Sequence, residues 1–239
     1  MKTKTLIRSL VVCAVAGAIF DLNAQTTVTI DPNATWIGYM NVSDLPAPAG
    51  DGAFQFGSSW GTADLTAVFS GSTLTLGPNA INDPATYWYV GGGAPGAAGN
   101  KNMDANMYVE DNTLAGQTVT FTAHTLSDTL SGTLPPYYVD GVAPYTCVAF
   151  IKDFVADYSS FTSTTIALTP GSDFSISLLT NPGDHVQYGF ETIGPNVWAT
   201  DVGLAGTVVL TPVIVPEPST LALAGLSGLA GLSLIRRRK

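Results

Sequence analysis

The densest group of side chains that could do chemistry lies between residues 100 and 111. Oxygen-bearing side chains recur there at short spacing, at Asn102, Asp104, Asn106, Glu110 and Asp111. Carboxylate and amide oxygens are the ligands that a hard cation such as calcium prefers. The glycine of an EF-hand loop is missing, and the alternation also fits the polar edge of a strand. The sequence therefore raises one structural calcium ion as a hypothesis, with no other cofactor expected.

Aromatic residues form a second group with possible chemistry. Sugar rings stack on aromatic planes, and nearby amides and carboxylates bond the hydroxyls. Tyr137 and Tyr138 follow two prolines in an expected loop, and Trp198 lies near the end of the chain's polar middle. We expect these three residues as candidate glycan contacts. The alternative is that such aromatic residues fill the core.

Two glutamates, Glu110 and Glu191, lie between the terminal segments of the chain. Glycoside hydrolysis needs two carboxylates about 5 to 9.5 Å apart. Sequence spacing does not establish such a pair, so we expect no catalysis. The competing hypothesis is a polysaccharide-active hydrolase or lyase with Glu110 or Glu191 as acid or base.

The elements that must position these residues are predicted to be strands. Thr, Val, Ser, Phe and Tyr dominate residues 25–211, Gly and Pro punctuate them at short intervals, and no sustained 3.6-residue stripe occurs. In the stretch that holds Val119, Phe121 and Ala123, apolar residues alternate with threonines, which predicts one buried face. Strands are expected at residues 26–30, 36–41, 53–56, 65–69, 73–76, 86–90, 106–109, 118–122, 145–154, 164–168, 174–179, 186–191 and 207–210.

This pattern predicts an all-β fold, a single two-sheet antiparallel sandwich over residues 25–211. Residues 102–210 are similar to the strand order of jelly-roll carbohydrate-binding modules, most clearly in the Leu-Ala-Gly-Gln-Thr of residues 114–118 that leads into an alternating strand. The resemblance implies a jelly-roll-like sandwich, and no binding residue is carried over from it.

The charge of the middle of the chain excludes one class of partner. Residues 25–215 hold two lysines, Lys101 and Lys152, against 16 acidic residues, a net charge of −14. Such a surface repels phosphate backbones, so nucleic acid is not an expected partner. Cations and neutral glycans are not disfavoured.

The two ends of the chain read as export signals. Residues 1–24 join a basic start to an apolar stretch and a small residue, Ala24, as in a secretory signal peptide. At the other end, residues 212–218 form a linker that contains Pro216, Glu217 and Pro218. Residues 219–235 are uncharged and as a helix would measure roughly 25 Å, just under the hydrocarbon thickness of a membrane. Arg236, Arg237, Arg238 and Lys239 follow as a cytoplasmic basic stop.

The order Pro-Glu-Pro, apolar segment and terminal basic cluster resembles the PEP-CTERM sorting signal of Gram-negative bacteria. The resemblance implies recognition by an exosortase-type membrane protease, a transient membrane-inserted precursor, and transfer to the outer surface or an extracellular matrix. The alternative is a single-pass anchor that is never processed. We therefore expect an exported, non-catalytic surface or matrix protein that binds exopolysaccharide, with a purely structural surface protein as a third hypothesis.

Overall fold

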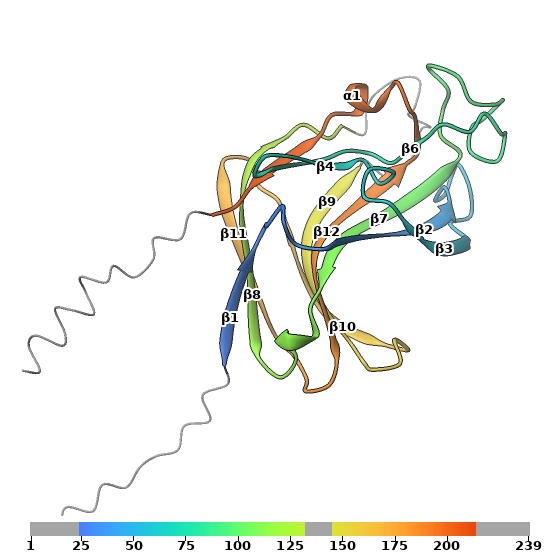
Figure 1. Cartoon of the computed structure of the whole chain (residues 1–239). Coiled ribbons are helices and arrows are strands. Elements are labelled where there is room, and N and C mark those ends of the chain that lie inside the picture. The colour runs from blue at the N-terminus through green and yellow to red at the C-terminus, as the bar shows by residue number, and fades with distance from the viewer. Residues whose placement is uncertain (1–23, 132–144, 214–239) are drawn as a thin grey trace, which may run out of the picture.

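The computed structural model describes residues 24–131 and 145–213, and these residues are nearly all β-structure (Figure 1). Two six-stranded sheets pack face to face, as the sequence predicts. The predicted signal peptide, apart from Ala24, and the predicted membrane helix at residues 219–235 lie outside the described residues. Within the described ranges, no helix combines the length and apolar character that a membrane crossing requires.

Sheet A is built around one long strand, β8 (Thr118–Asp128). β11 (Ser172–Leu179) pairs with residues 118–125 of β8 along one edge. Because a strand has only two edges, β1 (Gln25–Thr29) and β14 (Val208–Thr211) share the other one, β1 at residues 118–122 and β14 at residues 124–128. Beyond β14 the sheet continues through β5 (Thr73–Leu76) to β4 (Ala67–Ser70).

Sheet B is antiparallel throughout. Its order is β10 (Phe161–Ala167), β9 (Thr146–Phe154), β12 (His185–Pro195), β7 (Lys101–Glu110), β2 (Trp36–Asp44) and β3 (Phe54–Trp60). Register places Glu191 of β12 opposite Asn106 of β7 and Val148 of β9. Strands far apart in the chain therefore lie side by side in its centre.

Four short elements complete the described fold. β6 (Ala80–Ile81) pairs with β13 (Val197–Trp198) in a separate parallel ribbon. The 3-10 helix η1 (Asn112–Leu114) follows β7, and the short helix α1 (Val202–Ala205) precedes β14.

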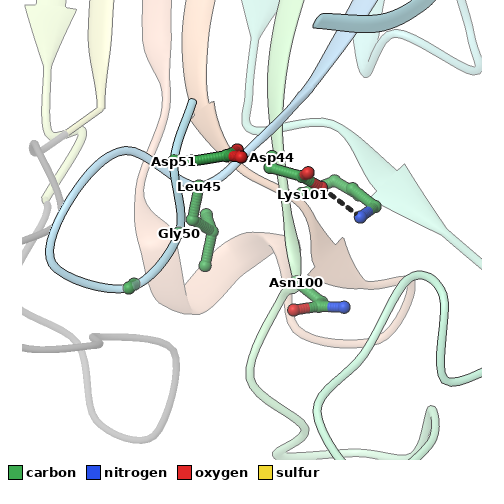
Figure 2. Close-up of a pocket in the computed structure, with 7 residues that line it drawn as sticks. Asp44, Leu45, Gly50, Asp51, Asn100 and Lys101 are labelled. Carbon is green, nitrogen blue, oxygen red and sulfur yellow. Dashed lines mark hydrogen bonds and ion pairs between the residues drawn. The ribbon is translucent and has the colours of Figure 1, made fainter. Parts of the chain in front are cut away.

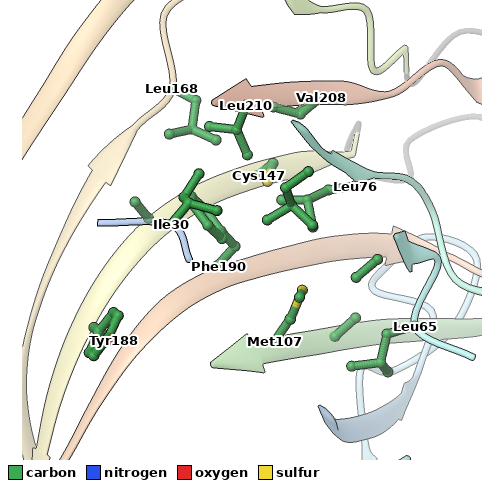
Figure 3. Close-up of a cluster of buried hydrophobic side chains, with 14 of the residues drawn as sticks. Ile30, Leu65, Leu76, Met107, Cys147, Leu168, Tyr188, Phe190, Val208 and Leu210 are labelled. Carbon is green, nitrogen blue, oxygen red and sulfur yellow. The ribbon is translucent and has the colours of Figure 1, made fainter. Parts of the chain in front are cut away.

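The core lies between the two sheets (Figure 3). The alternation predicted for β8 is confirmed, because Val119, Phe121 and Ala123 are fully buried. The ring of Phe121 lies 5.4 Å from that of Phe190 on β12, which joins the sheets. Cys147 is buried in this core, and desolvation raises the pKa of its thiol to about 12.

The structure corrects three expectations. Residues 86–90 are not a strand, because the backbone N–H groups of Trp88 and Tyr89 donate to Ala85 O in a turn. The Tyr89 hydroxyl also donates to Ile81 O and Val197 O. The pairing is not wholly antiparallel, since β1 runs parallel to β8 and β13 parallel to β6. The strands β6 and β13 were not predicted, because two residues are too few to show alternation.

Candidate functional site

The predicted calcium residues lie along β7 and just beyond it. Asn102, Asp104, Asn106 and Glu110 share one face of β7, and the residues between them, such as Met103 and Met107, are buried in the core. The alternation of oxygen-bearing residues therefore follows the pleat of a strand with one face in the core.

These residues have no common centre. Asn102 and Glu110 are eight positions apart on β7, which is about 26 Å. Asp111 accepts hydrogen bonds from the backbone N and Oγ1 of Thr113, at 2.9 and 2.7 Å, and so caps η1. No group of three or more His, Cys, Asp or Glu side chains in the described ranges could hold a metal ion. Calcium binding stays a prediction, without a single site formed by all five residues.

The outer face of sheet B instead holds a groove of about 700 Å³. Its lining side chains come from β3, β2, β7, β12, β9 and β10, and the turn after β9 adds Tyr158. The lining side chains are polar, charged and aromatic. They are Ile37, Tyr39, Asn41, Ser59, Asp104, Asn106, Tyr108, Glu110, Lys152, Phe154, Tyr158, Phe161, Gln187 and Glu191.

The middle of the groove is a chain of polar contacts centred on Lys152. Its Nζ lies 3.1 Å from Glu191 Oε1 and donates to Asn106 Oδ1 at 2.7 Å. Asn106 Nδ2 donates in turn to Asp104 Oδ1 at 2.7 Å. Asn41 Nδ2 donates to the other oxygen of Asp104 at 3.0 Å. The network joins four neighbouring strands and holds each of these side chains in place.

Glu191 has a perturbed carboxyl group. Burial in the groove raises its pKa, and the neighbouring Asp104 carboxylate adds to the effect, while the Lys152 ammonium opposes it. Desolvation and a like charge both disfavour the ionised form, and together they outweigh the opposite charge here. Glu191 therefore holds a proton more tightly than an exposed glutamate does.

One end of the groove is organised around Glu110. The Tyr158 hydroxyl donates to Oε1 at 2.9 Å, and Gln187 Nε2 donates to Oε2 at 2.8 Å. The ring of Tyr158 is stacked on His185 at 4.2 Å with an interplanar angle of 13°. Desolvation and the bond to Glu110 raise the pKa of Tyr158 to about 12, so its phenol stays protonated and acts as a donor.

Aromatic rings form an exposed platform at this end. Phe154 lies 4.7 Å from Phe161 and 5.7 Å from Tyr158, measured between ring centroids. Tyr158 and Phe161 are 48% and 51% exposed although both are large rings that line the groove. The exposed rings leave apolar surface open at this end of the groove.

The residues predicted to contact glycans are not those of the platform. Trp198 is half-buried, with its ring 5.5 Å from that of Tyr89, and it does not line the groove. Tyr137 and Tyr138 lie outside the described residues. Sequence reasoning missed Tyr158 and Phe161. The available signal was the turn at residues 155–160, which contains Tyr158 and is flanked by Phe154 and Phe161.

Glu110 and Glu191 line the same groove at different positions along it. In the register of β12 with β7, Gln187 lies opposite Glu110 and Glu191 lies opposite Asn106. The backbone positions of the two glutamates are therefore offset by four residues along the strands, about 13 Å. Hydrolysis requires about 5 to 9.5 Å between the two carboxyl groups. A role of Glu110 or Glu191 as acid or base stays a prediction.

A second pocket, of about 360 Å³, lies where β2 ends and β7 begins (Figure 2). The Lys101 ammonium lies 2.5 Å from Asp44 Oδ1 and 4.4 Å from the centre of the Tyr87 ring. The cation is therefore already paired within the chain, and this contact joins the ends of β2 and β7.

The comparison with protein families concerns the C-terminal segment. Residues 215–239 match the PEP-CTERM protein-sorting motif. The chain carries a PEP-CTERM sorting signal. Pro216, Glu217 and Pro218 and the basic residues 236–239 fall inside the matched range, which lies outside the described residues.

The PEP-CTERM motif indicates an exported protein that is anchored transiently in the membrane and processed by an exosortase, itself a membrane protein. The comparisons with curated proteins and with solved structures gave no match. The resemblance of the middle of the chain to jelly-roll carbohydrate-binding modules therefore gains no support from them.

Proposed function

We propose that this PEP-CTERM protein is released at the outer surface or into the extracellular matrix, where it binds polysaccharide without catalysis through the groove of sheet B. The observation that carries the proposal is the exposed platform of Tyr158 and Phe161 beside fixed polar side chains. Rings offer stacking, and Glu110, Asp104 and Asn106 offer hydrogen-bonding atoms for sugar hydroxyls.

A glycan array probed with the full chain in a neutral detergent tests the binding proposal. We expect Tyr158→Ala and Phe161→Ala each to weaken binding at least tenfold, because each removes a stacking surface. Leu126→Ala is the matched control, since Leu126 is also exposed, at 49%, but lies on sheet A. Wild-type chain that binds no glycan, or platform variants that bind as the wild type does, would contradict the proposal.

Release from the membrane is tested by mass spectrometry of the protein from its native host. We expect a mature form without the terminal Arg-Arg-Arg-Lys, and we expect Glu217→Ala to leave the precursor in the membrane. Asp51→Asn, in an exposed loop, is the control and should be processed normally. A mature form that retains residues 236–239 would show that the tail is an unprocessed anchor.

A polysaccharide-active hydrolase on the same scaffold is the second candidate. The raised pKa of Glu191 in the groove favours it, because general acids of glycosidases have raised pKa values. Incubation with the glycans bound on the array tests this candidate. New reducing ends that disappear in Glu191→Gln would establish catalysis, and binding without new ends would support the non-catalytic proposal.

A further inference from the structure

We propose that the groove of sheet B prefers a glycan with free amines, such as a chain of glucosamine units, over neutral or uronate chains. The inference depends on the polysaccharide binding proposed above and names its ligand class. The supporting observation is the set of partners that each charged side chain of the groove has.

Among the described residues that line the groove, Lys152 is the one lysine or arginine, and its charge is used internally. Lys152 Nζ contacts Glu191 Oε1 and Asn106 Oδ1, and it lies 4.1 Å from the centre of the Phe150 ring. Its side chain is only 14% exposed. Lys152 therefore balances Glu191 and leaves no free positive charge for an anionic sugar.

Among the described residues, the other two carboxylates accept hydrogen bonds mainly from amide and phenol groups, and Asp104 also shares one with Glu191. Asp104 accepts from Asn41 and Asn106. Glu110 accepts from Tyr158 and Gln187, and the nearest ring nitrogen of His185 is 3.8 Å from Oε1. Neutral donors fix the direction of a carboxylate but do not cancel its charge. The groove thus keeps a negative potential, which attracts an ammonium group and repels a uronate.

The negative groups lie beside the surface on which a sugar ring would stack. Glu110 is hydrogen-bonded to Tyr158, whose ring belongs to the exposed platform with Phe161. A sugar stacked there would have its substituents within reach of Glu110. Asp104 lies six positions from Glu110 on the same strand, about 20 Å along the groove. A chain with repeated amines could therefore meet both carboxylates, whereas a single sugar could meet only one.

Two hexamers that differ only in acetylation test the amine preference. Titration calorimetry uses the full chain in a neutral detergent at pH 6, where glucosamine amines are substantially protonated, with hexamers of glucosamine and of N-acetylglucosamine. We expect the glucosamine hexamer to bind at least tenfold more tightly at low salt, with an advantage that shrinks as salt is added. Equal affinity, or a preference for a uronate hexamer, would overturn the inference and leave polysaccharide binding standing. Failure to bind any glycan would overturn both.

Variants separate the groove from the general negative charge of the protein. Asp104→Asn should weaken the glucosamine hexamer at least fivefold and change the N-acetylglucosamine hexamer by less than twofold. Asp173→Asn is the matched control, because Asp173 is 62% exposed on sheet A. An equal loss in both variants would show non-specific attraction and contradict the inference. Glu110→Gln provides a second groove variant if Asp104→Asn does not fold, with the same expected loss.

Discussion

The two sheets of the sandwich have outer faces of different character. On sheet A, short hydroxyl side chains bond one another or the neighbouring backbone, as in the 2.8 Å contact between Thr120 and Ser177 and that from Thr29 Oγ1 to Thr122 O. On sheet B, long polar and aromatic side chains rise from six strands and leave a groove between them. The same alternation of buried and exposed residues thus gives sheet A an outer face whose hydroxyl groups are hydrogen-bonded within the sheet. It gives sheet B a candidate binding surface.

Side-chain size accounts for much of this difference. Tyr39 and Asn41 reach across sheet B because Gly57, on the neighbouring strand, has no side chain there. A Cβ at Gly57 would lie 2.8 Å from the Tyr39 hydroxyl and 2.9 Å from Asn41 Oδ1. Threonine and serine on sheet A are too short to enclose a comparable space. The groove therefore depends on the sizes of the side chains that lie next to one another on neighbouring strands, as well as on their polarity.

The largest contrast is expected when one ion pair is broken on each face. Lys152→Met should reduce the free energy of unfolding by about 3 kcal/mol, because it leaves Glu191 and Asp104 close together in the groove without a cation. Asp173→Asn, which breaks the more exposed pair with His124 on sheet A, should cost less than about 1 kcal/mol. Urea unfolding at pH 7 measures both values. Similar losses would mean that the two faces are electrostatically equivalent.

The pH dependence of stability sharpens the same contrast. Because the folded pKa of Glu191 is raised, its proton contributes stability below the unfolded value of about 4.3, and this contribution is lost as pH rises through the folded pKa. Relative to the wild type, Glu191→Gln should therefore gain stability as pH rises above about 4, by at most about 1.4 kcal/mol per pH unit. Denaturation curves at several pH values check this. Ser177→Ala is the control, and a wild-type curve parallel to that of Glu191→Gln would contradict the pKa shift.

The smallest effect is expected on sheet A. Ser177→Ala removes the hydrogen bond with Thr120 and should cost about 1 kcal/mol of unfolding free energy. Glycan affinity should not change, because this side chain lies on the outer face opposite the groove. Urea unfolding and the glycan titration measure the two quantities. A loss of binding in this variant would place a ligand surface on sheet A as well.

Predictability from the sequence differed between local and non-local features. Alternation identified the buried face of β8, because burial there depends on neighbours along one strand. It failed at residues 86–90, where the apolar and aromatic sequence resembles a strand but Tyr89 is held in a turn by bonds to Ile81 and Val197. Those partners lie up to 108 residues away. Local patterns carry no information on such contacts.

The candidate site shows the same limit. Oxygen-bearing residues on β7 were recognised, yet their partners were not, and they were interpreted as ligands of one ion. Lys152 stands 46 residues from Asn106 along the chain, and only the pairing of β12 between β7 and β9 brings them together. The exposed platform at residues 154–161 was missed because exposure of an aromatic ring depends on what packs above it.

By itself, the sequence determined the C-terminal sorting signal, the strand content and the buried face of β8, since each depends on residue type and short spacing. The PEP-CTERM signal is the clearest case, because a protease and a membrane recognise a contiguous segment, and the family match at residues 215–239 agrees with it. Only the tertiary structure decided where Asp104, Glu110, Lys152 and Glu191 lie relative to Tyr158 and Phe161. The physical reason is that a strand's pleat fixes the side to which each residue points, whereas the order of strands in a sheet fixes which residues meet.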